Sequence, residues 1–218
     1  MCYTERKSEE VLEMGDSLIY RQPTSADLEA IEQLTREAFW NVYQPGCFEH
    51  YLIHQMQESD EVVWDLCEVC EQNGEIIGHI FYTYVQVIGK DQTVYSLLCF
   101  GPVSVDPRFQ RSGIGSCLIR RSMQRAKEMG VLGIIITGDL GYYHRFGFKP
   151  AKDFQLFFED ETSDEFLLAV ELQERGLAGV CGRVKFSDFF FDIDPIAVER
   201  FDKKFPPKEK LQLPGQLG

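Results

Sequence analysis

Long apolar runs are absent from this sequence of 218 residues. No apolar stretch approaches the roughly eighteen residues that a membrane-spanning helix needs. Residues 1–16 are polar and acidic, without the apolar core of a secretory signal peptide. We therefore expect a soluble, cytoplasmic protein.

Positive charge is also scarce. Lysine and arginine total 22 against 35 aspartates and glutamates, which gives a formal net charge of −13. Such an acidic surface repels the phosphates of nucleic acids and of anionic membranes, so neither is an expected partner. It would attract a cationic amine, although many bacterial cytosolic proteins are equally acidic.

Regularly spaced cysteines are missing as well. Among the seven cysteines only Cys67 and Cys70 lie close together, and no second pair or histidine motif follows them. A structural zinc site needs a complete set of such ligands. We expect reduced, mostly buried thiols and no bound metal.

The composition that remains is typical of a globular domain, with 44% apolar and 26% charged residues. We expect an N-terminal extension over residues 1–17, a single domain over residues 18–190 and a C-terminal tail over residues 191–218. Pro206-Pro207 and the lysines around them argue against a packed core in the tail.

Apolar periodicity and turn signals predict strands and helices along the domain. Thr24 and Asp27 resemble a capping box in front of an amphipathic helix. Asn73-Gly74 is the dipeptide preferred in tight hairpins, and the unbroken apolar run at residues 132–137 suits a strand buried on both faces. The expected helices cover residues 28–38, 48–57 and 113–129, with a helical turn at 142–146; the expected strands cover residues 18–22, 65–72, 75–88, 93–105, 132–137, 154–159, 165–172 and 184–191.

The most informative stretch is the glycine-rich loop after the strand at residues 93–105. Gly113 and Gly115 lack a Cβ, so a ligand can approach the backbone N–H groups closely. A helix that begins here presents free donors and a positive dipole end, and Arg108 and Arg111 add positive charge. The loop therefore suits a phosphate group, although the same glycines could simply close a tight turn.

Residues 110–115, Gln-Arg-Ser-Gly-Ile-Gly, resemble the Gln/Arg-x-x-Gly-x-Gly/Ala signature of the GNAT acetyltransferase superfamily. Val-Asp-Pro precedes the signature at residues 105–107, and a Tyr-x-x-x-Gly-Phe element follows it at residues 143–148. The opening at residues 20–27 is also similar to that of GNAT proteins. The resemblance covers about residues 18–172, and residues 138–148 look most like the YhbS-like branch of predicted acetyltransferases.

The resemblance implies an α/β (α+β) fold, the GNAT fold, with a mixed, mostly antiparallel central sheet of about six to seven strands flanked by helices. The strands at residues 93–105 and 132–137 would splay apart. It also implies an N-acetyltransferase that uses acetyl-CoA as co-substrate, with a small-molecule amine or a protein amino group as acceptor. The oligomeric state, a homodimer included, is left open.

The resemblance places the cofactor site on the loop and on the strand before it. Backbone N–H groups of the loop would bind the pyrophosphate, and those of the strand would hold the pantetheine arm. Tyr143 stands where GNAT enzymes often place the acid that protonates the leaving thiolate, and a one-residue error in alignment would select Tyr142. The expected cofactor-binding residues are Val103, Val105, Gln110, Arg111, Ser112, Gly113, Ile114 and Gly115.

The base that deprotonates the amine is not assigned by the sequence. Many relatives carry an acidic residue before the Val-x-Pro turn, whereas this chain has Phe-Gly-Pro at residues 100–102. Asp139, Glu68, His79 and a chain of water molecules are the alternatives.

Other hypotheses stay open beside direct acetyl transfer. A non-catalytic acyl-CoA-binding or regulatory module would account for the missing acid, and another acyl-CoA could be the donor. Cys99 or Cys117 could form a covalent acyl-enzyme, although neither has an evident histidine partner. Tyr51 and His54, in the second expected helix, could face the acceptor.

Overall fold

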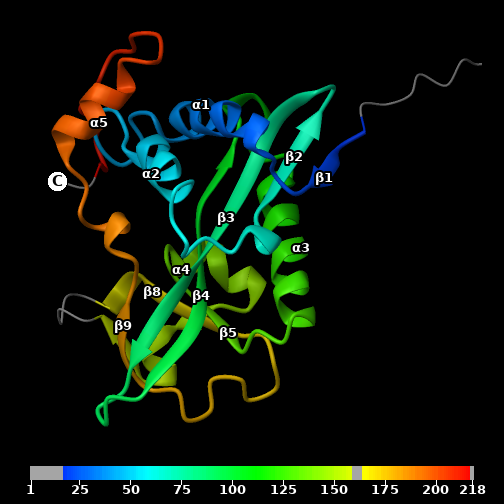
Figure 1. The fold of residues 1–218 in the computed structure, drawn as a ribbon, viewed down its shortest axis with the longest axis vertical. Coiled ribbons are helices and arrows are strands. Elements are labelled where there is room, and N and C mark those ends of the chain that lie inside the picture. Colours follow the sequence, from blue (N-terminus) through cyan, green and yellow to red (C-terminus); the bar gives the residue numbers. More distant parts are fainter. Residues whose placement is uncertain (1–16, 159–163, 217–218) are drawn as a thin grey trace, which may run out of the picture.

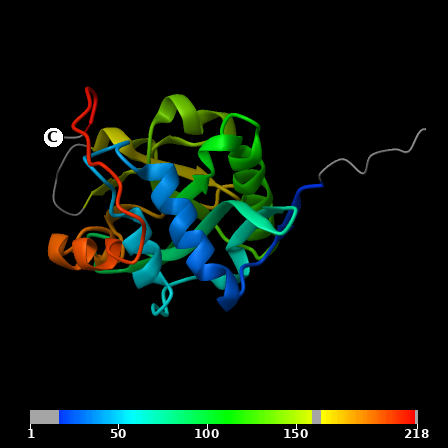
Figure 2. The same ribbon diagram turned by 90° about the horizontal axis from the view of Figure 1, so that it is seen from above.

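The computed structural model describes residues 17–158 and 164–216, and within them a single mixed sheet forms the centre of the molecule. The sheet has nine strands in the order β1-β2-β3-β4-β5-β8-β6, with β9 paired to β3 and β7 paired to β9. Helix α1 covers one face and helix α3 the other (Figures 1 and 2). The elements are β1 (Ile19–Arg21), α1 (Leu28–Phe39), α2 (Glu49–Met56), β2 (Glu68–Gln72), β3 (Glu75–Ile88), β4 (Val94–Val105), α3 (Ile114–Glu128), β5 (Gly133–Thr137), α4 (Leu140–Tyr143), β6 (Lys149–Pro150), β7 (Leu156–Phe158), β8 (Leu167–Glu171), β9 (Gly182–Lys185) and α5 (Pro195–Asp202).

The expected fold class is confirmed. Most neighbouring strands are antiparallel, with β3 and β4 as the long central pair, whereas β4–β5 and β7–β9 are parallel. The apolar run of β5 is buried over residues 133–136, between β4 and β8, as its lack of polar alternation predicts. Among the described residues, no helix is long and apolar enough to cross a membrane.

Strands β4 and β5 separate toward their carboxyl ends. They share one paired position, Leu98 with Ile134. Beyond it, β3 pairs Tyr82 with Phe100 and Ile80 with Val103, so β4 carries one more residue than β3 in this interval and bulges. The bulge falls at Gly101-Pro102, and Pro102 has no N–H to offer a neighbouring strand. The two parallel strands therefore have no paired position beyond Leu98 and Ile134, and we refer to this unpaired interval, next to the loops that follow the strands, as the gap between β4 and β5.

The second half of the chain differs in detail from the expected elements. The sheet has nine strands rather than six to seven, because the short strands β6, β7 and β9 extend it. The segment at residues 186–191, expected to be strand, turns into a 3-10 helix at Asp188–Phe190. Its phenylalanine rings pack against one another, Phe189 on Phe190 at 4.8 Å between centroids, so apolar composition alone did not distinguish a strand from a ring cluster.

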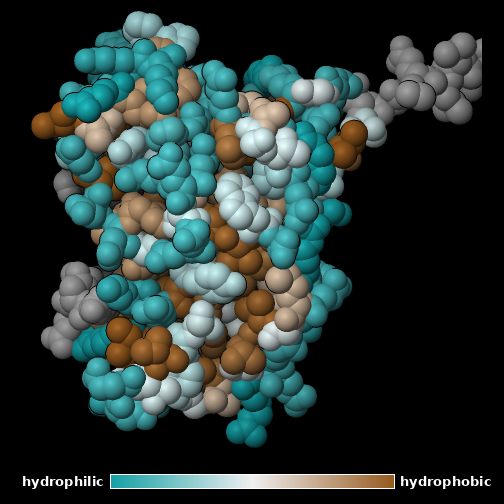
Figure 3. All heavy atoms as spheres, viewed as in Figure 1, coloured by the Kyte–Doolittle hydropathy of each residue, from teal (hydrophilic) through white to brown (hydrophobic). Residues whose placement is uncertain are grey.

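The segment expected as a C-terminal tail contains α5 and packs against α1 and the loop that joins α1 to α2. Phe201 is buried in it, and the carbonyl of Glu209 accepts hydrogen bonds from Trp40 Nε1 at 2.8 Å and from Asn41 Nδ2 at 3.0 Å. Gln216 Nε2 donates to the carbonyl of Asn41 at 2.9 Å. Figure 3 shows mostly hydrophilic side chains over α1, α2 and α5, and more hydrophobic ones over the middle of the same face.

Candidate functional site

The glycine-rich loop lies at the surface and leads directly into α3. Residues 110–113 are exposed, and Gly113 is the N-cap residue of α3 with a left-handed φ of 94°. Gly113 offers no side-chain oxygen to the first turn of the helix, and a Cβ built on it would meet nothing within 4 Å. The N-terminus of α3 is therefore uncapped by its own N-cap residue and open to an anion.

The two arginines beside the loop have different surroundings. Arg108 donates to Asp106 at 2.7 Å and also pairs with Glu75. Its guanidinium therefore stabilises the turn after β4. Arg111 is exposed, with a left-handed φ of 63°, and forms no ion pair within residues 17–158 and 164–216. Arg111 is thus the arginine available to an anion at this helix end.

The outer half of β4 presents backbone groups to the gap beside β5. The N–H of Asp106 donates to the carbonyl of Ile77 on β3 at 2.9 Å. Because successive residues of a strand direct their N–H groups to opposite edges, Val103 and Val105 direct theirs away from β3. The carbonyl of Val105 accordingly accepts from Gln110 Nε2 at 3.3 Å.

Tyr143 lies across this gap. Its ring is 6.0 Å from that of Phe100 on β4 and 5.8 Å from that of Phe148. On the β5 side it covers Gly138, where a Cβ would lie 2.4 Å from Tyr143 Cε2. Burial raises the pKa of Tyr143 above its ordinary value, so the phenol stays protonated and can donate.

Tyr142 occupies a different place from Tyr143. Its hydroxyl lies 3.9 Å from the position that a Cβ on Gly115 would take, next to the first turn of α3. The guanidinium of Arg145 lies over its ring at 4.7 Å from the centroid. Tyr142 therefore adjoins the glycine-rich loop, whereas Tyr143 adjoins the gap between the strands.

Each of the three side chains considered as the base that deprotonates the amine lies within hydrogen-bonding distance of a polar neighbour. Glu68 is buried and accepts from Arg121 at 2.9 Å. His79 Nε2 lies 2.7 Å from Thr35 Oγ1, and burial lowers the pKa of His79 to about 3. Asp139 accepts from the N–H of Gly141 at 2.8 Å and caps α4.

The two thiols considered as nucleophiles, those of Cys99 and Cys117, are packed against neighbouring side chains. Cys99 is buried on β4, which raises its pKa to about 12. Cys117 lies in α3 near the phenol of Tyr20. Within the described residues, no cluster of three or more histidine, cysteine, aspartate or glutamate side chains is arranged to hold a metal ion.

Tyr51 and His54 lie on α2, against α5. Both rings contact Phe201, His54 in a stacked arrangement at 4.5 Å and Tyr51 at 5.5 Å between centroids. His54 Nδ1 also lies 2.8 Å from Glu32 Oε1. The two residues line a cavity of about 600 Å³ that α5 closes on one side.

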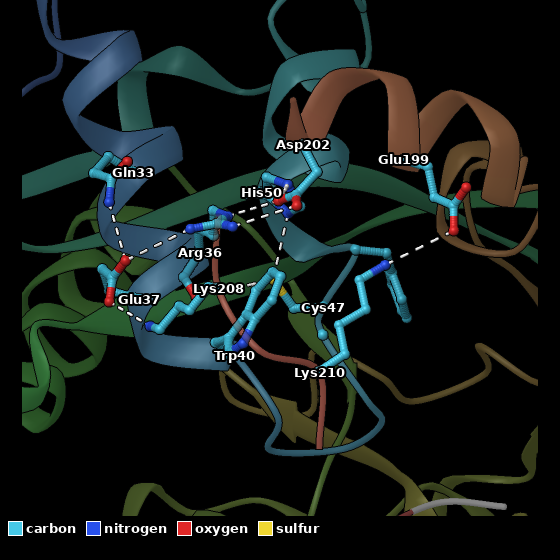
Figure 4. A network of polar contacts seen from close by, with 12 residues as sticks. Gln33, Arg36, Glu37, Trp40, Cys47, His50, Glu199, Asp202, Lys208 and Lys210 are labelled. Atoms are coloured by element: carbon cyan, nitrogen blue, oxygen red, sulfur yellow. Dashed lines mark hydrogen bonds and ion pairs between the residues drawn. The ribbon is translucent and has the colours of Figure 1, made fainter. Parts of the chain in front are cut away.

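A polar network between α1, α2 and α5 has no counterpart in the sequence analysis (Figure 4). Arg36 Nε donates to Asp202 Oδ1 at 2.6 Å, and its guanidinium lies 4.2 Å from the ring centroid of Trp40. His50 Nε2 lies 3.2 Å from the same Asp202 oxygen, and His50 Nδ1 lies 3.4 Å from Cys47 Sγ. The segments involved are distant in sequence, so no local pattern marks the network.

The network has the residue types of a cysteine nucleophile with its base, but not the electrostatics. Burial raises the pKa of Cys47 to about 12 and lowers the pKa of His50 to about 4. A neutral, buried thiol is a poor nucleophile. The network therefore joins α5 to the start of α2 and to α1.

This chain is similar to known proteins in sequence and in fold. The sequence of residues 19–151 matches the family model of the acetyltransferase (GNAT) domain. The chain belongs to the GNAT family of acetyltransferases.

Its relatives include two proteins of Escherichia coli. Over 173 residues the chain is 24% identical to the uncharacterized N-acetyltransferase YhbS, covering 79% of this chain and 98% of YhbS. Over 100 residues it is 29% identical to the uncharacterized N-acetyltransferase YjhQ, covering 45% of this chain and 54% of YjhQ.

Two crystal structures share the fold. The structure of E. coli YhbS in complex with CoA superimposes with a TM-score of 0.70 at 23% identity, covering 87% of this chain and 96% of YhbS. A GNAT acetyltransferase from Brucella melitensis in complex with acetyl-CoA gives a TM-score of 0.65 at 26% identity, covering 80% of this chain and 99% of that protein.

Proposed function

We propose that this protein transfers an acetyl group from acetyl-CoA to a primary amine by direct attack in a ternary complex. The observation that carries the proposal is the gap between β4 and β5, which has backbone N–H groups on one side, the half-buried phenol of Tyr143 across it and an uncapped helix end beside it. The acetyl-CoA and CoA complexes of the two structural relatives support the choice of cofactor.

The loop and β4 would hold the cofactor. Backbone N–H groups of residues 110–115 would bind the pyrophosphate with the aid of the α3 dipole and Arg111. The N–H groups of Val103 and Val105 would bind the pantetheine arm and the thioester oxygen. A donor aimed at the developing oxyanion can lower the barrier by about 3 kcal/mol.

Tyr143 would protonate the sulfur as it leaves. A free thiol has a pKa of about 8.5 and a tyrosine about 10, so the transfer from phenol to thiolate is nearly balanced in water. Burial raises the pKa of Tyr143, and it would destabilise the CoA thiolate in the same way, so the proton transfer moves the negative charge from the sulfur to the phenol oxygen within the same surroundings. For this proton transfer, the position of the Tyr143 hydroxyl near the sulfur therefore matters more than its acidity.

The first test is thermal unfolding with and without saturating acetyl-CoA, beside succinyl-CoA and free CoA. A ligand at about one hundred times its dissociation constant stabilises by roughly 2.7 kcal/mol, which raises the Tm by several degrees. A shift with acetyl-CoA is the expected result. A shift with another acyl-CoA alone would change the donor, and no shift with any of them would refute the proposal.

Tyr143→Phe separates the enzyme from a module that only binds acyl-CoA. We expect unchanged acetyl-CoA affinity by calorimetry and turnover lowered about tenfold or more, because the variant loses only the proton donor. Assays with spermidine, L-lysine and a lysine-containing peptide cover small-molecule and protein acceptors. A wild-type protein that binds acetyl-CoA tightly and turns over none of them would favour the module.

A further inference from the structure

A cavity of about 400 Å³ lies between α3 and the end of the sheet formed by β8 and β6. We call it the α3–β8 cavity. Its volume is in the range that binds small organic molecules. Its lining includes three basic side chains, two phenylalanine rings and one acidic side chain, namely Arg120, Lys127, Lys149, Phe146, Phe154 and Glu171.

The basic side chains of the α3–β8 cavity are not neutralised by acids. Arg120, Lys127 and Lys149 are exposed and form no ion pair with any residue that the structure describes. The lining acid, Glu171, uses one carboxylate oxygen to accept from the backbone N–H of Leu177 at 3.0 Å. The cavity therefore has a surplus of positive charge in a chain whose formal net charge is −13. Charge complementarity favours an anionic ligand.

Aromatic side chains form another part of the lining. Phe146 is buried, and the guanidinium of Arg120 lies 5.0 Å from its ring centroid. Phe154 is half-buried in the same cavity. Aromatic rings and guanidinium groups stack on the planar bases of nucleotides, and lysines bind phosphate oxygens. A ligand with both a planar ring and a phosphate would use both parts of the lining, whereas a phosphate ion alone would leave the rings without a contact.

The α3–β8 cavity is separate from the expected cofactor site. Gly113 is the N-cap residue of α3, and Lys127 is near the other end of the helix, roughly 20 Å away at a rise of about 1.5 Å per residue. Glu171 pairs with Gly133, the first residue of β5, whereas the gap between β4 and β5 begins beyond Ile134. The 3′-phosphate of CoA is attached to the ribose next to the pyrophosphate. A CoA molecule with its pyrophosphate at Gly113 therefore leaves the end of the cavity at Lys127 to another ligand.

We propose that the α3–β8 cavity binds a nucleoside monophosphate, as a second site distinct from the acetyl-CoA site. The base would lie against Phe146 and Phe154, and the phosphate would bind Lys127 and Lys149. The binding is non-covalent, and it does not depend on the proposed acetyl transfer.

Isothermal titration calorimetry with AMP, GMP, CMP and UMP tests the proposal. We expect one molecule of at least one of these nucleotides to bind per chain. Lys127→Gln and Lys149→Gln should each weaken that binding about tenfold, because each removes a charge-assisted hydrogen bond. Lys90→Gln, which removes an exposed lysine from the turn between β3 and β4, is the matched control and should keep the wild-type affinity. No binding of any of the four nucleotides, or equal affinity in all four proteins, would overturn the proposal.

The two parts of the ligand are tested separately. The nucleoside of the tightest-binding nucleotide has the base without the phosphate, and inorganic phosphate has the charge without the base. Each should bind at least about tenfold more weakly than the nucleotide, because each contacts only part of the lining. If inorganic phosphate binds as tightly as the nucleotide, the assignment of a nucleotide is wrong.

The glycine-rich loop is the competing location for the nucleotide. Arg111→Gln, which removes the exposed arginine of that loop, should leave nucleotide binding unchanged. Protein saturated with acetyl-CoA should also still bind the nucleotide. Competition between the two ligands, or a loss of nucleotide binding in Arg111→Gln alone, would refute a second site. If acetyl-CoA does not bind at all, the proposed function fails, whereas the comparison of the lysine variants still tests the cavity.

Discussion

Gly138→Ala is expected to displace Tyr143 without contacting the glycine-rich loop. The added Cβ would lie 2.4 Å from Tyr143 Cε2 and 2.7 Å from Cδ2, well inside van der Waals contact. The rings of Phe100 and Phe148 pack against Tyr143 as well, so the ring has to move by about 1 Å within a packed site.

The consequence should appear mainly in turnover. A misplacement of about 1 Å at a reacting group can lower the rate about 100-fold, and overpacking lowers the free energy of unfolding by about 1–3 kcal/mol. Acetyl-CoA affinity should change much less, because the uncapped helix end at Gly113 is unaltered. Steady-state kinetics, calorimetry and thermal unfolding measure the three quantities separately.

A double-mutant cycle with Tyr143→Phe decides whether the effect passes through Tyr143. If it does, Gly138→Ala should lower kcat far less in the Phe background than in the wild-type background. Two effects that simply multiply would refute the reasoning, because Gly138 would then act on another part of the site.

Four other outcomes are expected. Gly113→Val forces a branched side chain into a left-handed φ of 94°, and should lower stability by about 1–2 kcal/mol and weaken acetyl-CoA binding in calorimetry. Arg111→Gln should weaken that binding about tenfold while Arg108→Gln, whose arginine already pairs with carboxylates, should not. Asp202→Ala removes the nearer carboxylate of the buried Arg36, leaving Glu37 at 3.9 Å as its partner, and should lower the free energy of unfolding in urea by about 3–5 kcal/mol. His79 has a folded pKa of about 3, below its unfolded value of about 6.5, so its contribution to stability is complete above pH 6.5 and is lost as the pH falls toward 3; His79→Gln should flatten that part of the pH–stability curve.

Much of the candidate site follows from signals that are close together in the sequence. The glycine at position 113 allows the left-handed residue that starts α3, and the unbroken apolar run predicts the buried β5 beside it. The bulge in β4 coincides with Gly101-Pro102, and glycine and proline within a strand commonly mark a bulge. Local conformational preference is enough to predict the helix start, the buried strand and the bulge, because the residues that favour each of these conformations lie within the segment that adopts it.

The different positions of the two adjacent tyrosines could not be predicted from the local sequence. Tyr142 and Tyr143 are equivalent to any pattern that tolerates a shift of one residue. Packing separates them, since one hydroxyl adjoins Gly115 on α3 and the other ring covers Gly138 after β5. Which face of a short helix meets which strand depends on neighbours that are not adjacent in the chain.

By itself, the sequence determined the fold class, the glycine-rich loop and the two tyrosines near it, because short-range periodicity, turn residues and a compact motif encode them. Only the tertiary structure decided that Glu68, His79 and Asp139 each have a close polar neighbour, and that Asp202 reaches Arg36 across 166 residues. Burial and charge pairing depend on what surrounds a side chain in space, and the chain brings those surroundings together only when it folds.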